Sequence, residues 1–129
     1  MVNASRNVEF VYLYRDGSNY KALGAVVFSN KNGRHLEELR RRMQLAILSE
    51  QTFVAHQVRV PELFLYLNGE LTHDDHCFHE FHELQDTETE PTDELERSIE
   101  EFLNEVETQA AKGWRAFEPA IRAGRPRTC

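Results

Sequence analysis

Residues 8–28 decide the fold, because they read as two strands joined by a tight turn: Val8-Glu9-Phe10-Val11-Tyr12-Leu13-Tyr14-Arg15-Asp16-Gly17-Ser18-Asn19-Tyr20-Lys21-Ala22-Leu23-Gly24-Ala25-Val26-Val27-Phe28. β-Branched and aromatic residues dominate both arms, and such residues suit a pleated, partly buried strand. Asp16-Gly17 and Asn19 readily adopt the positive φ that a hairpin turn can require. We therefore predict strands over 8–14 and 20–28, with Gly24 at a bulge or a close backbone approach.

A turn at 29–33 leads into a predicted helix over 34–49. The apolar residues of this segment recur with the 3.6-residue period of a helix and form one stripe. The stripe consists of Leu36, Leu39, Met43, Ala46 and Ile47. The three arginines 40–42 lie mostly off the stripe, which is typical of a solvated helix face.

The middle of the chain predicts further strands. Residues 53–60 have a strand-like composition, which Pro61 ends because proline cannot donate a hydrogen bond into a sheet. A short apolar run follows over 63–67. Residues 75–84 favour a strand over a tight helical turn, and residues 86–92 read as a solvated loop.

A second helix is predicted to begin at a Thr92 cap and to end at Gly113. Asp93 and Glu94 would then lie in the first turn, where the positive end of the helix dipole favours carboxylates. Its apolar stripe comprises Leu95, Ile99, Phe102, Leu103, Val106 and Ala110.

This order of elements predicts an α+β fold, an antiparallel sheet with two amphipathic helices packed on one face. A chain of 129 residues usually forms one domain. We expect that single domain to span residues 1–115 and to be followed by a flexible basic tail over 116–129.

Charge is distributed in blocks of opposite sign. The chain carries a net charge of −7, yet residues 70–107 contain 15 Asp and Glu and one arginine, while both flanking segments are net positive. The acidic block would repel a nucleic-acid backbone, so we expect no nucleic-acid partner. Blocks of opposite sign favour contacts within or between subunits, or a compact anionic ligand held by a few arginines.

The expected location is the cytoplasm. No run approaches the ~18 apolar residues that would cross a bilayer, so we expect no membrane partner. Residues 1–6 lack the apolar core of a signal peptide. Cys77 and Cys129 are too few for a disulfide framework, and we expect free thiols.

Residues 73–83 hold four of the six histidines, one cysteine and four carboxylates, so a metal site is one hypothesis. The histidines are three residues apart, and on a strand His76 and His82 would share one face while His79 lies on the other. A strand therefore brings at most two of these rings side by side, whereas zinc needs three or four converging ligands. We expect no metal and no cofactor.

The remaining candidates are residues that recognise a ligand. Arginine forks bind phosphate oxygens, aromatic rings stack on nucleobases, and Asn or Asp side chains read ribose hydroxyls. We assign Arg15 and Arg59 to phosphates, Phe78 or Phe81 to base stacking, and Asn19 or Asp75 to ribose hydroxyls. Tyr20, in the hairpin, completes the predicted ligand-binding set.

The hairpin 14–21, the strand-strand-helix start and the late helix ending at Gly113-Trp114 resemble the phage anti-Thoeris sponge proteins. That resemblance extends over residues 8–115. It implies a compact antiparallel sheet with two helices, assembled as an oligomer, that binds signals of the cyclic ADP-ribose type without cleaving them. In a phage, such a protein would act in the cytoplasm of the bacterial host.

The leading hypothesis is therefore a non-enzymatic protein that sequesters a cyclic nucleotide immune signal and counteracts antiviral defence, as a homo-oligomer. Two alternatives stay open. The first is a metal-dependent hydrolase built on His73, His76, His79 and the neighbouring aspartates. The second is an interaction module whose acidic segment docks a basic partner, with steep salt dependence.

Overall fold

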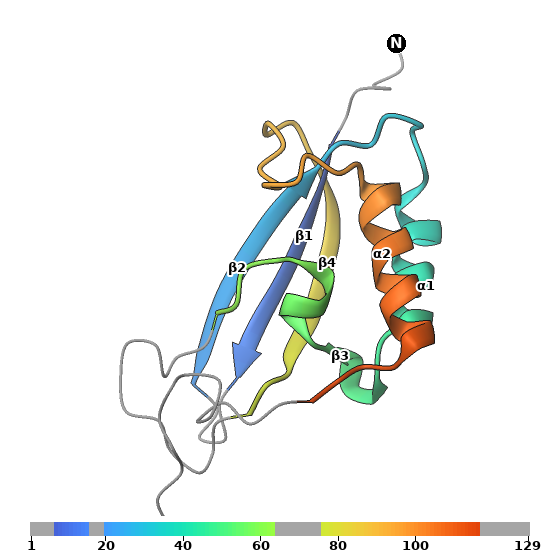
Figure 1. Cartoon of the computed structure of the whole chain (residues 1–129). Helices are drawn as coiled ribbons and strands as arrows, with labels where there is room; N and C mark the ends of the chain where they lie inside the picture. The colour runs from blue at the N-terminus through green and yellow to red at the C-terminus, as the bar shows by residue number, and fades with distance from the viewer. Residues whose placement is uncertain (1–6, 16–19, 64–75, 117–129) are drawn as a thin grey trace, which may run out of the picture.

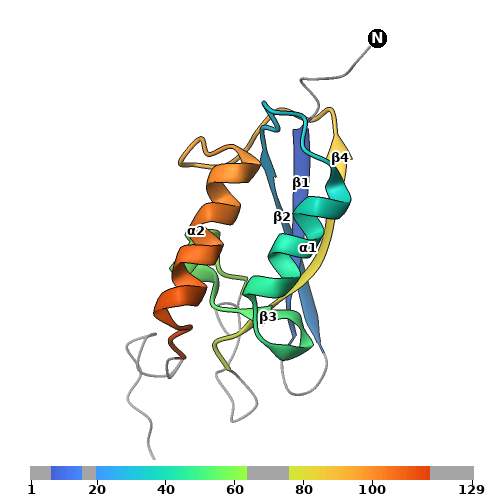
Figure 2. The same ribbon diagram turned by 90° about the vertical axis from the view of Figure 1, so that its right-hand side faces the viewer.

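The computed structural model describes residues 7–15, 20–63 and 76–116. Four strands form an antiparallel sheet in the order β2-β1-β4-β3 (Figure 1). Both helices cover the same face of this sheet (Figure 2). The elements are β1 (Asn7–Arg15), β2 (Lys21–Phe28), α1 (Leu36–Ala46), β3 (Thr52–Phe53), β4 (His79–Thr87) and α2 (Ile99–Lys112). The predicted α+β fold is confirmed.

The predicted antiparallel pairing of β1 with β2 is also confirmed, while the turn predicted at residues 16–19 lies outside the described residues. Tyr12 lies opposite Gly24, and the register runs without interruption from Val8 opposite Phe28 to Arg15 opposite Lys21. Gly24 allows a close approach between segments, because the side chain of Leu63 packs directly over it. On its other side β1 pairs with β4, with a bulge between Val11 and Tyr12.

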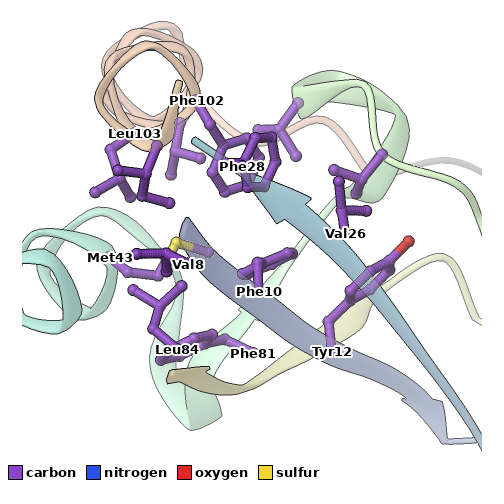
Figure 3. Close-up of a cluster of buried hydrophobic side chains, with 14 of the residues drawn as sticks. Val8, Phe10, Tyr12, Val26, Phe28, Met43, Phe81, Leu84, Phe102 and Leu103 are labelled. Carbon is purple, nitrogen blue, oxygen red and sulfur yellow. The ribbon is translucent and has the colours of Figure 1, made fainter. Parts of the chain in front are cut away.

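The core lies between the sheet and the two helices (Figure 3). Phe10 is at its centre, with its ring stacked on Tyr12 at 5.1 Å and tilted against Phe102 at 5.0 Å. Phe28 stacks on Phe102 with centroids 4.4 Å apart. Alternation along β1 and the helical stripes therefore converge on one aromatic cluster.

The predicted stripe of α1 faces this core. Leu39 and Met43 are fully buried, and the other three members are partly buried against the same cluster. The helix is shorter than predicted, since it ends at Ala46.

The predicted start of the second helix was wrong. Ser98, not Thr92, caps α2, and it forms a capping box with Glu101. Thr92 instead bonds to the edge of β2: its N–H donates to the Val27 carbonyl oxygen, and its hydroxyl accepts from the Val27 N–H. Glu96 has a φ of 55°, which interrupts any helix before Ser98. Leu95, predicted for the stripe, is 47% exposed.

The predicted strand 53–60 was also wrong. Only Thr52–Phe53 pairs with β4, and Ala55–Val58 form a 3₁₀ turn that ends at Arg59 in the left-handed conformation. The apolar residues of this segment are nonetheless buried. The strand-like composition of this segment therefore indicated that its side chains are buried, not that its backbone is extended.

The strand predicted over 75–84 occupies His79–Thr87, so part of the predicted loop 86–92 belongs to β4. Residues 64–67 of the apolar run, and all of the tail except Ala116, lie outside the described residues.

Opposite charge blocks meet within the molecule. Four carboxylates of the acidic block pair with arginines of the first part of the chain: Glu80 with Arg15, Glu83 with Arg40, Glu100 with Arg34 and Glu107 with Arg42. The expectation of contacts within the subunit is confirmed. Such exposed pairs usually contribute about 0–1 kcal/mol each, so they orient the elements more than they stabilise them.

Candidate functional site

A groove of about 640 Å³ runs beside the outer edge of β2. Ala25 and Val26 of β2 lie at its base, His56 and residues 59–62 form one wall, and residues 92–95 form the other. Its volume lies within the range usual for sites that bind small ligands.

Open backbone groups of β2 face this groove. In an antiparallel strand the N–H and C=O of one residue point to the same side, and alternate residues share that side. Val27 directs both groups outward to Thr92. Ala25, two residues earlier and lining the groove, therefore presents one donor and one acceptor to a ligand.

Arg97 joins the two walls. Its guanidinium donates to both carboxylate oxygens of Asp93 at 2.9 Å and to the carbonyl oxygens of Val58 at 2.8 Å and Arg59 at 2.9 Å. It also lies over the rings of Phe28 and Phe102, at 5.6 and 5.2 Å from their centroids.

The charge on Asp93 is maintained by this contact. Burial alone would raise the pKa of the Asp93 carboxyl, but hydrogen bonds from the side chain and the backbone of Arg97 outweigh it and lower that pKa. The pair therefore stays ionised and holds both walls of the groove in place.

Arg59 is the cation of the groove. It follows the 3₁₀ turn with φ 61° and ψ 47°, and its exposed side chain lines the groove opposite Glu94 and Leu95 of the other wall. Among the described arginines, only Arg41 and Arg59 have no hydrogen-bond or ion-pair partner for the guanidinium, and only Arg59 of these two lines the groove. Its guanidinium is therefore available to a ligand.

The end of the first wall is fastened to the sheet at two points. The Tyr12 hydroxyl donates to the Pro61 carbonyl oxygen at 2.6 Å, and the Leu63 N–H donates to Nε2 of His79 at 2.9 Å. Between these points lies Glu62, whose carboxylate is 3.8 Å from Nδ1 of His56. A carboxylate and an imidazole are thereby placed together on the groove wall.

Gly24→Ala tests the packing of the Leu63 side chain over Gly24. A Cβ at this position would lie 2.8 and 2.9 Å from the two Leu63 methyl carbons, so Leu63 has to shift. The free energy of unfolding should change by less than about 1 kcal/mol, because better strand propensity offsets the displacement. The Leu63 methyl resonances in an NMR spectrum should move.

Gly33→Ala is the matched control for this change. Gly33 has a φ of 61° and open space around it. This substitution should cost about 1–2 kcal/mol and leave the Leu63 resonances in place. Unmoved Leu63 methyls in Gly24→Ala would contradict the contact.

The structure divides the predicted ligand-binding residues. Arg59 lines the groove, but Phe81 is buried in the core with its ring stacked on Phe10, which favours Phe78 of the two residues predicted for base stacking. Arg15 is held by Glu80 at 2.9 and 3.3 Å, and this hydrogen bonding raises the pKa of its guanidinium. The structure therefore places Arg15 in an ion pair outside the groove, and its assignment to a phosphate stays a prediction.

Two further predicted residues lie at the hairpin end of the sheet. Tyr20 is 70% exposed, just before β2. Phe78 is half-buried, and its N–H donates to His76, whose Nε2 is 2.7 Å from the Arg15 carbonyl oxygen. None of these residues lines the groove. Asn19 and Asp75 lie outside the described residues.

Sequence reasoning missed His56, Glu62 and Glu94. His56 and Glu62 flank Pro61, which was read as the end of a strand, and Glu94 was placed in a helix. A proline followed by a carboxylate beside an apolar segment was the available signal for a fixed turn, but it does not identify a groove.

The described residues contain no group of three or more His, Cys, Asp or Glu side chains arranged to hold a metal ion. His73 and Asp74 lie outside these residues, so the hydrolase alternative stays a hypothesis. Over the same part of the chain, neither helix has the length and apolar character needed to cross a membrane.

Comparison with protein-family models, with curated proteins and with solved structures finds no match to this chain.

Proposed function

We propose that this protein binds a nucleotide of the cyclic ADP-ribose type in the β2 groove and sequesters it without cleavage, which would counteract an antiviral signal. The observation that carries this proposal is Arg59, whose guanidinium has no partner among the described residues and lies at a nucleotide-sized groove in an acidic protein. Guanidinium groups bind phosphate oxygens through two parallel hydrogen bonds.

The other groups of the groove suit the remaining parts of such a ligand. The Glu94 carboxylate and Oε1 of Glu62, whose Oε2 is buried, can accept hydrogen bonds from ribose hydroxyls. The His56 ring and Pro61 offer flat surfaces to a base, and the Ala25 backbone offers a donor and an acceptor to its edge. The same carboxylates repel a ligand rich in phosphate, so we infer a ligand with few phosphates and several hydroxyls.

Sequestration sets a required affinity. Free signal must fall below the threshold of its receptor, and nanomolar binding corresponds to about −12 kcal/mol. The homo-oligomer expected from the sequence belongs to the same proposal. The exposed Leu23 on β2 and Tyr20 beside it support it, because exposed apolar side chains gain by burial against another chain.

Arg59→Ala should weaken binding of cyclic ADP-ribose by about 10- to 100-fold, because a hydrogen bond to a charged group contributes about 1.5–3 kcal/mol. Isothermal titration calorimetry measures this loss. Arg41→Ala is the matched control, since it removes the same charge from an exposed position on α1 and should leave the affinity unchanged. Adenosine, which has no phosphate, should bind both variants equally.

Heat denaturation of the loaded protein, followed by mass spectrometry of the supernatant, distinguishes the alternatives. Intact nucleotide supports sequestration. Converted product would instead support the hydrolase. Equal affinity of Arg59→Ala and Arg41→Ala for cyclic ADP-ribose would overturn the assignment of the groove. Absence of any nucleotide binding, with salt-sensitive capture of a basic protein, would favour the interaction module.

A further inference from the structure

Glu62 is fixed through the two peptide groups that flank it. The Pro61 carbonyl precedes Glu62 and accepts from the Tyr12 hydroxyl, and the Leu63 N–H follows it and donates to His79. Tyr12 and His79 belong to β1 and β4, and both side chains are almost completely buried. A buried anchor on each side therefore holds the one wall carboxylate that has a histidine beside it.

We propose that His79 is the positioning residue of the groove: its uncharged imidazole holds the Leu63 N–H and so aims Glu62 at the ribose hydroxyls of the ligand. This inference rests on the proposed function. His79 itself does not line the groove, so it acts through the wall and not by contact with the ligand.

The chemistry of the ring fits this role. A backbone N–H is a donor, so Nε2 of His79 must be unprotonated to accept from Leu63. Burial, and secondly the charge of His76, lower the pKa of His79 to about 4 against the opposing effect of a backbone hydrogen bond with Cys77. His79 is therefore an acceptor throughout the neutral pH range.

The neighbours of this ring are mostly uncharged. From β1, the rings of Tyr12 and Tyr14 lie 6.0 and 5.4 Å away, and from β3 that of Phe53 lies at 6.2 Å. The titratable neighbour preceding β4 is His76, and the charged group on the wall itself is Glu62. Burial of Tyr12 raises the pKa of its hydroxyl, so the second anchor stays a donor.

Binding of ADP and of 2′,3′-dideoxy-ADP tests the inference, because only the first carries ribose hydroxyls. The native protein should prefer ADP by about tenfold or more, the value of a hydrogen bond to a charged group. His79→Phe keeps a buried ring without an acceptor and should abolish this preference. Its affinity for the dideoxy analogue should be retained, because Arg97 holds Arg59 independently of His79. A general loss of structure in His79→Phe would instead weaken the binding of both ligands.

His79→Gln is the second variant, since its amide oxygen can still accept from Leu63. It should retain part of the preference, and equal preference in all three proteins would overturn the inference. Hydrogen exchange of the Leu63 amide gives a readout without ligand: protection should fall in His79→Phe. If no nucleotide binds, the proposed function fails, but hydrogen exchange still tests whether His79 holds the Leu63 N–H. Unchanged protection of the Leu63 amide in His79→Phe would overturn the inference about His79.

Discussion

Arg97→Ala is expected to lower the free energy of unfolding by about 3–5 kcal/mol, because it leaves a buried charge without its partner. The side chains of Arg97 and Asp93 are only 10% and 3% exposed. The substitution also removes the donors to the Val58 and Arg59 carbonyls and the cation over two aromatic rings. Urea unfolding followed by circular dichroism measures the loss.

Two comparisons separate the contributions of this side chain. Arg97→Lys keeps the positive charge, but an ammonium group lacks the planar donors that reach Asp93 and both carbonyl oxygens at once. This variant should therefore recover only part of the lost free energy of unfolding. The double variant Arg97→Ala, Asp93→Ala removes both charges and should be more stable than Arg97→Ala alone. A loss below about 1 kcal/mol in Arg97→Ala, the value of an exposed pair, would contradict the buried role.

Local patterns in the sequence were sufficient to predict the elements whose apolar residues recur at a regular spacing. The hairpin followed from alternation along β1 and from the turn residues after it, and α1 followed from its 3.6-residue stripe. Those patterns are local, because each element buries one continuous face. The capping box of Ser98 and Glu101 is also a local signal, and it marks the true start of α2. Thr92 is a residue type that often caps a helix, but no Glu or Gln follows it three positions later to complete a capping box.

The rest of the fold depends on contacts between distant residues. The turn at Ala55–Val58 is held by Arg97, 39 positions beyond Val58, so nothing in its own composition distinguishes it from a strand. Arg15 shows the same limit at the site. Its residue type suits a phosphate, but a carboxylate 65 positions away binds it first. Arg59 is available because no described carboxylate pairs with it, and a sequence does not display that property.

The free energy of unfolding is expected to fall by about 3 kcal/mol between pH 6.5 and pH 4 through His79 alone, since its ordinary pKa is 6.5 and its folded pKa is about 4. Between these values the unfolded chain binds a proton at His79 and the folded chain does not. Stability therefore rises with pH over this window, is complete above pH 6.5 and is lost as pH falls toward 4.

Urea unfolding at pH 4, 5, 6 and 7 isolates this contribution when the native protein is compared with His79→Gln. The variant cannot titrate at this position, so its stability should vary less over the window. Asp93 also loses stability in acid, because its folded pKa is lowered, but most of that loss falls below its ordinary pKa of 3.8 and it occurs in both proteins. Parallel pH profiles would mean that His79 is protonated in the folded state well above pH 4. In that state Nε2 could not accept from Leu63, and the wall that carries Glu62 would have lost its anchor.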